Sequence, residues 1–224
     1  MHADLPLVFV HGLSTSSAIW RDQVTAMRRL GHPCVAVDLP GHGANAHARF
    51  TLDAALAAID DAVRGFDTPP LLVGLSLGGY TSLAYAARTP GAVAGVVLSG
   101  CSTEIRGKPI RLYRRASSRV LRALRHPREA SWTVVADMLR ALQGYSSLAD
   151  LRRLAVPVWI VNGRWDVLRF GERQVLAARP EALHHVIRRA GHDVNTHAPV
   201  AFTRVLLDAV GQVAARVPRA TTAT

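Results

Sequence analysis

The sequence contains few cysteines, and it lacks both a long hydrophobic run and a start that looks like a secretory leader. Cys34 and Cys101 are too few for a disulfide framework, and their spacing is not that of metal ligands. No apolar run approaches the roughly 20 residues that a membrane-spanning helix needs. Residues 1–10 do not show a basic region followed by an apolar region, which is typical of a signal peptide. We therefore expect a cytoplasmic protein with free thiols, no metal or other cofactor, and no stable membrane insertion.

Aromatic residues are also scarce: they make up 6% of the 224 residues, against 49% for hydrophobic and 19% for charged residues. Disordered chains combine low hydrophobicity with high charge, so this composition predicts a folded globular protein. The length suits one domain with a full-sized core. Because the chain shows neither an aromatic pattern nor a motif typical of nucleic-acid-binding proteins, we do not expect it to bind nucleic acid.

Lysine is almost absent, since Lys108 is the single lysine among 27 basic residues, and the net charge is +11. Residues 105–140 contain ten of the basic residues and only two acidic ones, Glu129 and Asp137. This segment therefore carries a net charge of +8, which leaves +3 for the rest of the chain. The positive charge is local, and it is either a solvated surface or a docking face for an acidic partner.

Short apolar runs alternate with segments of helical periodicity along most of the chain. The predicted strands are residues 5–10, 34–38, 71–75, 93–99, 158–162 and 183–188. The predicted helices are residues 17–30, 51–64 (with Thr51 as the N-cap), 77–88, 171–178 and 199–213. Because the strand runs are apolar throughout, they predict a parallel sheet of about six strands covered by helices on both faces. Such sheets carry their chemistry at the carboxyl ends of the strands.

A G-x-S-x-G pentapeptide, residues 74–78, lies between a predicted strand and a predicted helix. The glycines allow the chain to reverse direction within a few residues, because a side chain at either position would crowd the neighbouring backbone. Ser76 at its centre is then held on a strained turn with its hydroxyl exposed. A glycine-rich turn without chemistry is the simpler alternative, but the strand before and the helix after it favour a nucleophile.

A serine nucleophile needs a base, and among the ten histidines His192 is the best placed. It directly follows the last predicted strand, so its imidazole is expected above the carboxyl edge of the sheet. Asp166 follows the preceding strand, where its carboxylate can hold the Nδ1 proton of His192. The chain order Ser76, Asp166, His192 is the order expected for a triad on this type of sheet.

The oxyanion of the tetrahedral intermediate requires preorganised hydrogen-bond donors. The backbone N–H of Leu77, at the start of the helix after Ser76, is one candidate. The backbone N–H of Leu13 is the other, because Gly12 lets the loop after the first strand turn sharply. A simple strand-ending turn is the alternative interpretation of residues 11–13.

Taken together, these segments resemble the α/β-hydrolase family. The resemblance is carried by Val-His-Gly at 10–12, Asp-Leu-Pro-Gly-His-Gly at 38–43, Gly-Leu-Ser-Leu-Gly-Gly at 74–79, Gly-x-x-Asp at 163–166 and Gly-His at 191–192. It implies an α/β-hydrolase fold with a Ser-His-Asp triad, and it assigns His42 a role in supporting a loop. Two departures are the apparent lack of the family's first two antiparallel strands and a short cap. Some members place the acid after the fourth predicted strand, which makes Glu104 a rival to Asp166.

In this family, helical material between the two halves of the core forms a lid over the active site. We expect residues 1–104 and 151–217 to form the core, 105–150 a small helical cap, and 218–224 a disordered tail. The cap is predicted to contain helices at 111–125, rich in arginine, and at 131–142. Trp20, Trp132 and Met138 are the candidates for lining the substrate pocket.

The resemblance implies a serine hydrolase that cleaves a carboxylic ester, lactone or thioester. A lyase or carbon–carbon hydrolase using the same triad is an alternative, because the lyase of menaquinone synthesis shares the segments at 38–43 and 74–79. That lyase has an arginine where this chain has Tyr80. A non-catalytic receptor for a small molecule is a third alternative. The arginine-rich cap is a candidate docking face for an acidic acyl carrier protein or a coenzyme A thioester.

Overall fold

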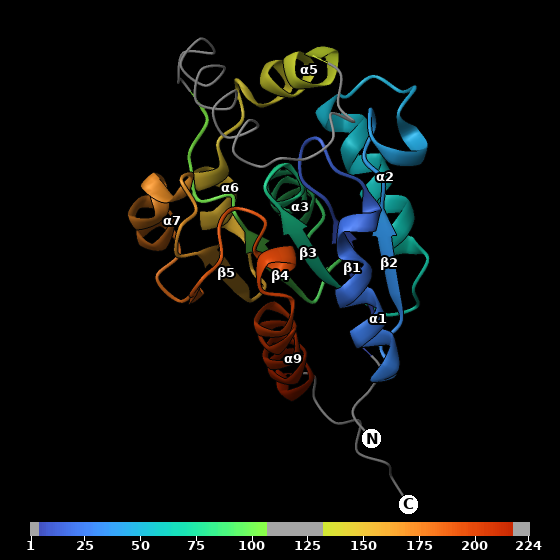
Figure 1. Cartoon of the computed structure of the whole chain (residues 1–224), viewed down its shortest axis with the longest axis vertical. Helices are drawn as coiled ribbons and strands as arrows, with labels where there is room; N and C mark the ends of the chain where they lie inside the picture. Colours follow the sequence, from blue (N-terminus) through green and yellow to red (C-terminus); the bar gives the residue numbers. More distant parts are fainter. Residues whose placement is uncertain (1–4, 107–131, 217–224) are drawn as a thin grey trace, which may run out of the picture.

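A six-stranded, wholly parallel sheet forms the centre of the molecule (Figure 1). The computed structural model describes residues 5–106 and 132–216. The strands are β1 (Leu7–Val10), β2 (Cys34–Val37), β3 (Leu71–Leu75), β4 (Gly95–Ser99), β5 (Val158–Gly163) and β6 (Leu183–Ile187). Their order across the sheet is β2-β1-β3-β4-β5-β6. The predicted parallel sheet of about six strands is thus confirmed.

Burial along each strand follows its place in the sheet. Every residue of β1, β3, β4 and β5 is buried, because helices cover both faces of these inner strands. The edge strands differ: β2 exposes Val35, and β6 alternates between partly exposed and exposed side chains up to Ile187. The continuous apolar runs that predicted the strands therefore reflect burial on two faces.

Helices cover the sheet as two layers. On one face pack α1 (Arg21–Arg29) and α9 (Pro199–Arg216), preceded by the 3-10 turn η1 (Ser17–Trp20) and the single turn α8 (Val194–His197). On the other pack α2 (Leu52–Arg64), α3 (Leu77–Arg88), α6 (Ser147–Arg153) and α7 (Glu172–Ala178). The predicted cap of α2 is confirmed, because the Thr51 hydroxyl accepts a hydrogen bond from the N–H of Ala54 at 3.1 Å.

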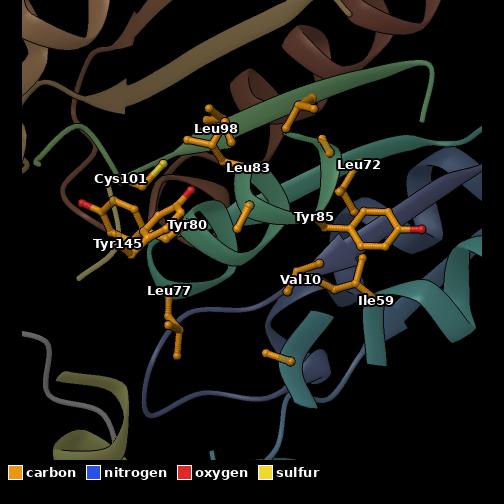
Figure 2. Close-up of a cluster of buried hydrophobic side chains, with 14 of the residues drawn as sticks. Val10, Ile59, Leu72, Leu77, Tyr80, Leu83, Tyr85, Leu98, Cys101 and Tyr145 are labelled. Atoms are coloured by element: carbon orange, nitrogen blue, oxygen red, sulfur yellow. The ribbon is translucent and has the colours of Figure 1, made fainter. Parts of the chain in front are cut away.

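The sheet separates two hydrophobic clusters. Figure 2 shows part of the larger one, where side chains from β1, β3 and β4 meet those of α2 and α3. Ile59 of α2 and Leu72 of β3 lie in it close to the ring of Tyr85. The second cluster lies under α1 and α9 and contains Phe9 and Phe202. Burial of side chains this large typically contributes about 2–3 kcal/mol each, so the two clusters are the main source of stability.

The structure differs from the sequence-based expectation in its short helices. The predicted helix at 17–30 begins with the 3-10 turn η1 before α1 starts at Arg21. The short helices α6 and α8 were not predicted, because four to seven residues are too few to show a helical period. The expected end of the cap at residue 150 falls inside α6, which packs against α3 and α7.

Within the predicted cap, the structure describes α5 (Trp132–Leu142), which lies beyond the carboxyl ends of the strands at the top of Figure 1. Two contacts attach α5 to the loop that follows β2. Val134 lies so close to Gly41 that a Cβ on this glycine would be 2.8 Å from it. Arg49 forms a two-pronged ion pair with the buried carboxylate of Asp137, with both N–O distances at 2.6 Å. The predicted arginine-rich helix at 111–125 lies outside the described residues.

None of the helices within residues 5–106 and 132–216 combines the length and the apolar character that crossing a membrane requires.

Candidate active site

Ser76 occupies a sharp turn between β3 and α3. Its backbone has φ 52° and ψ −112°, a left-handed conformation that is strained for a residue with a side chain. The flanking glycines make the turn sterically feasible. A Cβ on Gly74 would collide with the carbonyl oxygen of Gly78, and a Cβ on Gly78 would collide with that of Val10. The G-x-S-x-G pattern thus exists because β3, β1 and α3 approach each other too closely for side chains.

Hydrogen bonds on both sides of Ser76 hold this strained conformation. Its N–H donates to the carbonyl of Ser99 at the end of β4 at 2.7 Å, and its carbonyl accepts from the N–H of Tyr80 at 3.1 Å. Strained backbone persists where the surroundings over-determine it, and such positions cluster at active sites. The serine is therefore fixed at the carboxyl edge of the sheet.

His192 and Asp166 form a buried pair at the same edge. The Nδ1 of His192 lies 3.1 Å from each carboxylate oxygen of Asp166. Because an ionised carboxylate only accepts hydrogen bonds, the ring carries its proton on Nδ1 and leaves Nε2 free to accept one. The side chain of His192 is 8% exposed and that of Asp166 is 1% exposed, so the pair is shielded from water.

The environment of His192 favours its protonated form. Burial by itself would lower the pKa of the imidazole, but the hydrogen bond to Asp166 and the negative charges of Asp166 and Asp193 outweigh it and raise the pKa. A raised pKa makes the ring a stronger base once it is neutral. This is the property that a base accepting a serine proton requires.

Glycine contacts bring the three predicted triad residues to one region. A Cβ on Gly100 would lie 3.0 Å from Cε1 of His192, and Gly100 directly follows Ser99, which binds the backbone of Ser76. A Cβ on Gly163 would collide with the carbonyl of Gly191, so the end of β5 touches the chain just before His192. The structure thus places His192 against Gly100, the residue after the backbone partner of Ser76, and places the end of β5, which leads to Asp166, against the chain just before His192.

The loop after β1 lies against Ser76. A Cβ on Gly12 would stand 3.4 Å from the Cβ of Ser76, so the two residues are within van der Waals reach of each other. Leu13 follows in this loop, and Leu77 is the first residue of α3, where backbone N–H groups lack partners within the helix. Both predicted oxyanion donors therefore belong to segments next to Ser76. The positive end of the α3 dipole favours negative charge at the same place.

Two buried histidines brace the loop after β1, which carries Leu13. The Nδ1–H of His11 donates to the carbonyl of Gly12 at 2.7 Å, and its Nε2 accepts from the N–H of Leu39 at 3.0 Å. His42 donates from Nδ1 to the carbonyl of Pro40 at 3.1 Å and accepts from the N–H of Ser14 at 3.3 Å. Each ring both donates and accepts, which requires neutral imidazoles. These contacts agree with the loop-supporting role expected for His42, and sequence reasoning did not assign that role to His11.

Glu104, the rival acid, lies elsewhere in the contact network. Its Oε2 accepts hydrogen bonds from the Ser147 hydroxyl at 3.0 Å and from the N–H of Leu148 at 2.9 Å, at the start of α6. Its carboxylate is therefore engaged in capping a helix, whereas that of Asp166 binds the imidazole of His192.

The structure describes the side chains of two of the three predicted pocket residues. The prediction that Trp20 lines the pocket is wrong, because this residue is fully buried between Phe9 and Phe202 under α1 and α9. An amphipathic pattern cannot tell a ring that packs beneath the sheet from one that lines its edge. Met138 is buried in the larger cluster on α5, above the strand ends. The side chain of Trp132 lies outside the described part of the chain.

A second group at this edge that could act as a nucleophile is the buried thiol of Cys101. Burial raises its pKa to about 12, helped by the charge of Asp166, so the thiol stays protonated and unreactive at neutral pH. In the described ranges, 5–106 and 132–216, no cluster of three or more histidines, cysteines or carboxylates has the arrangement of a metal site.

The chain is similar over most of its length to known enzymes. It is 28% identical over 236 residues to the 2-succinyl-6-hydroxy-2,4-cyclohexadiene-1-carboxylate synthase of Enterobacter sp. (strain 638), with 89% of each chain covered. It is 22% identical to the esterase Rv0045c of Mycobacterium tuberculosis, covering 89% of this chain and 80% of the esterase. The thioesterase domain of the curacin biosynthetic pathway has a similar structure, with a TM-score of 0.74, 20% identity and 92% of each chain covered.

A sequence profile gives the assignment. The profile of the alpha/beta hydrolase family matches residues 7–205, which include the turn of Ser76, the Asp166 strand end and the His192 loop. The match spans nearly the whole described part of the chain. The protein belongs to the alpha/beta hydrolase family.

Proposed function

We propose that the protein is a serine hydrolase that cleaves a carboxylic ester, lactone or thioester through an acyl-enzyme on Ser76. The observation that carries the proposal is the buried His192–Asp166 pair beside a serine in a strained, left-handed turn. A histidine whose Nδ1–H is held by a carboxylate has its Nε2 available as a base, and a serine hydroxyl needs such a base to become a nucleophile.

In the proposed reaction, the Ser76 hydroxyl attacks the acyl carbon while Nε2 of His192 takes its proton. The resulting oxyanion is bound by the backbone N–H groups of Leu13 and Leu77, each of which typically contributes about 3 kcal/mol to lowering the barrier. His192 then returns the proton to the departing alcohol or thiol. Water hydrolyses the acyl-enzyme with His192 again acting as the base, and Asp166 keeps the ring in the productive tautomer throughout.

The named activities of the relatives support this class of reaction. One relative is an esterase and one structural neighbour is a thioesterase domain, so both leaving groups, an alcohol and a thiol, occur on this fold. The chemistry of Ser76 is the same for both. The choice between them depends on the acyl pocket and on what the cap admits.

Covalent labelling tests the proposal directly. Treatment with a fluorophosphonate, followed by mass spectrometry of the peptides, is expected to find the label on Ser76, and a chromogenic short-chain ester is expected to give a burst of product. Ser76→Ala should abolish labelling and lower kcat by about 10⁴-fold or more. Ser82→Ala, which removes a buried hydroxyl from the same helix, is the matched control and should keep both. A label on another serine, or no burst with any ester or thioester, would overturn the proposal.

A lyase is the second candidate, because the Enterobacter synthase matches this chain over 89% of both sequences. The position of Tyr80 weighs against it. The resemblance to that lyase leads us to expect an arginine there, whereas Tyr80 is buried and donates its hydroxyl proton to the carbonyl of Thr103 at 2.6 Å. Turnover of the synthase's own substrate without burst kinetics on esters would favour the lyase. Ligand binding without turnover of either kind would favour a non-catalytic receptor.

A further inference from the structure

The loop that carries Asp166, residues 164–171, is tied down at several points, and we call it the acid loop. The N–H of Asp166 donates to the carbonyl of Gly163 at 3.1 Å, and the N–H of Leu168 donates to the Asp166 carboxylate at 2.8 Å. The carbonyl of Leu168 accepts from the hydroxyl of Thr103 at 2.6 Å. The backbone of the acid loop thus curls round the carboxylate that binds His192.

Arg169 closes this loop on itself. Its Nη1 donates to the carbonyl of Gly163, at the end of β5, at 3.4 Å and to that of Arg164, at the start of the loop, at 3.3 Å. Its Nε and Nη2 donate to the two carboxylate oxygens of Glu172 at 2.8 and 2.7 Å. A planar guanidinium can make both sets of bonds at once, which a lysine ammonium cannot. One side chain therefore connects the end of β5, the far end of the loop and the first residue of α7.

Glu172 links Arg169 to the interior of the sheet. Its Oε2 accepts from Nδ2 of Asn162 at 2.6 Å, and Asn162 is a fully buried residue of β5. Nε2 of His184, on the neighbouring strand β6, lies 3.2 Å from the same oxygen. Burial would raise the pKa of Glu172, but the hydrogen bonds from Arg169 and Asn162 outweigh it and lower the pKa to about 2, so the carboxylate stays charged.

We propose that Arg169 and Glu172 are positioning residues that hold the Asp166 carboxylate against Nδ1 of His192. The proposal rests on the function proposed above. Neither side chain is hydrogen-bonded to Asp166 or His192 among the described contacts. Both act through the backbone of the acid loop, and the positive charge of Arg169 also acts on Asp166. Displacement of a catalytic group by about 1 Å can cost up to 10²-fold in rate. Loss of the Arg169 bonds therefore lowers kcat, whereas KM changes little because Arg169 acts on the acid and not on the substrate.

The chain provides a matched control in Arg179, at the other end of α7. Arg179 also donates to two carbonyls, those of Leu154 at 2.5 Å and Val156 at 3.2 Å, and lies 3.1 Å from a glutamate, Glu181. It joins segments near the amino end of β5, opposite the site. Its side chain is 13% exposed and that of Arg169 is 23% exposed, so the two positions are similarly enclosed. Arg169→Met and Arg179→Met thus remove comparable contacts, but only the contacts of Arg169 lie next to Asp166.

The experiment combines kinetics with an NMR titration of the His192 ring in the wild type and in both variants. Arg169→Met is expected to lower kcat about 10-fold, to leave KM within about 2-fold, and to shift the titration of His192 to lower pH, because Asp166 raises the pKa of that ring. Arg179→Met is expected to lower the melting temperature without either change. Arg169→Lys, which keeps the charge but not the fork, should restore only part of kcat.

The inference is overturned if Arg169→Met matches Arg179→Met in kcat and the His192 titration stays at its wild-type position. If Arg169→Met does not fold, Glu172→Gln, which preserves shape and removes the charge, decides by the same two readouts. The titration needs no substrate. A wild type that is not labelled at Ser76 would therefore overturn the proposed function, while the shift of His192 would still test the positioning by Arg169.

Discussion

Gly100 lies directly against the imidazole of His192. A Cβ at this position would be 3.0 Å from Cε1 and 3.1 Å from Nδ1 of the ring, and the backbone of Gly100 has φ +61°. The absence of a side chain at the end of β4 therefore creates the space that the base occupies. Gly100, which is not one of the three predicted triad residues, therefore limits where the imidazole of His192 can lie.

Gly100→Ala is predicted to impair catalysis more than stability. The new methyl group would push the ring away from Asp166, and we expect kcat to fall about 10- to 100-fold. Gly91→Ala is the control, because Gly91 also has a positive φ, +84°, but a Cβ there would meet nothing within 4 Å. Both variants incur the strain of a left-handed alanine, about 1–2 kcal/mol, and this appears in a urea titration. Equal kcat values for the two variants would show that the contact with His192 is unimportant.

Asp166 rather than Glu104 is predicted to be the acid. Asp166→Asn keeps the shape but favours the wrong tautomer of His192, so kcat should fall by about 10⁴-fold. Glu104→Gln should keep kcat near that of the wild type and lower only the melting temperature, because the Glu104 carboxylate caps α6. Steady-state kinetics on one chromogenic ester distinguishes the two. The reverse pattern would assign the acid to Glu104.

The parts of this structure that sequence could predict are those with a local signal. The strands have continuous apolar runs, and residues 74–78 need their glycines because three backbones converge there, so fold and elbow could be predicted from neighbouring residues alone. The pairing of Asp166 with His192 could be predicted because consecutive parallel strands end at one edge, and the catalytic roles of both residues stay predictions.

Contacts between distant segments left no such signal. Trp20 carries the same pattern whether it packs under the sheet or lines its edge, and the structure places it in the core. The bond of Asn162 to Glu172 joins a buried strand to a helix, and no spacing in the sequence encodes it. The brace that His11 forms with Leu39 depends likewise on how two loops meet, 28 residues apart.

Stability is predicted to fall on acidification because of His11. Burial lowers the pKa of His11 to about 4, from 6.5, with a smaller contribution of the same sign from His42; the carbonyl of Gly12 and the charge of Asp38 oppose the shift. His11 therefore takes up a proton below about pH 6.5 in the unfolded chain, but only below about pH 4 in the folded protein. The contribution of His11 to the free energy of unfolding is therefore complete above pH 6.5. It decreases as the pH falls, by on the order of 3 kcal/mol near pH 4.

Urea titrations of the wild type and of His11→Gln between pH 7.5 and about 4.5 isolate this contribution. The glutamine amide can donate to Gly12 and accept from Leu39 but does not titrate, so the variant should lose less stability over this range. The carboxylates titrate in both proteins and cancel in the comparison. Identical pH dependence in the two proteins would mean that His11 does not contribute.

The last prediction concerns the arginine-rich segment at 111–125, which lies outside the described residues but whose charge is fixed by the sequence. We propose that it recruits an acidic acyl carrier, so that the substrate is a carrier-bound thioester. Association would then be steered by charge, and kcat/KM should fall steeply with salt because exposed charges are screened beyond about 8 Å at physiological ionic strength. Replacing Arg115, Arg119 and Arg122 by glutamate should raise KM for the carrier-bound thioester.

A small neutral ester is the control in the same salt series, because a damaged cap would impair both substrates alike while a lost docking face impairs only the carrier-bound one. The Arg49–Asp137 pair, which holds α5 to the loop after β2, is itself an ion pair, and its Arg49 side chain is exposed to solvent. Salt can therefore loosen the cap as well as screen the carrier. Only a difference between the two substrates identifies docking, and parallel salt curves would show that the arginines are a solvated surface.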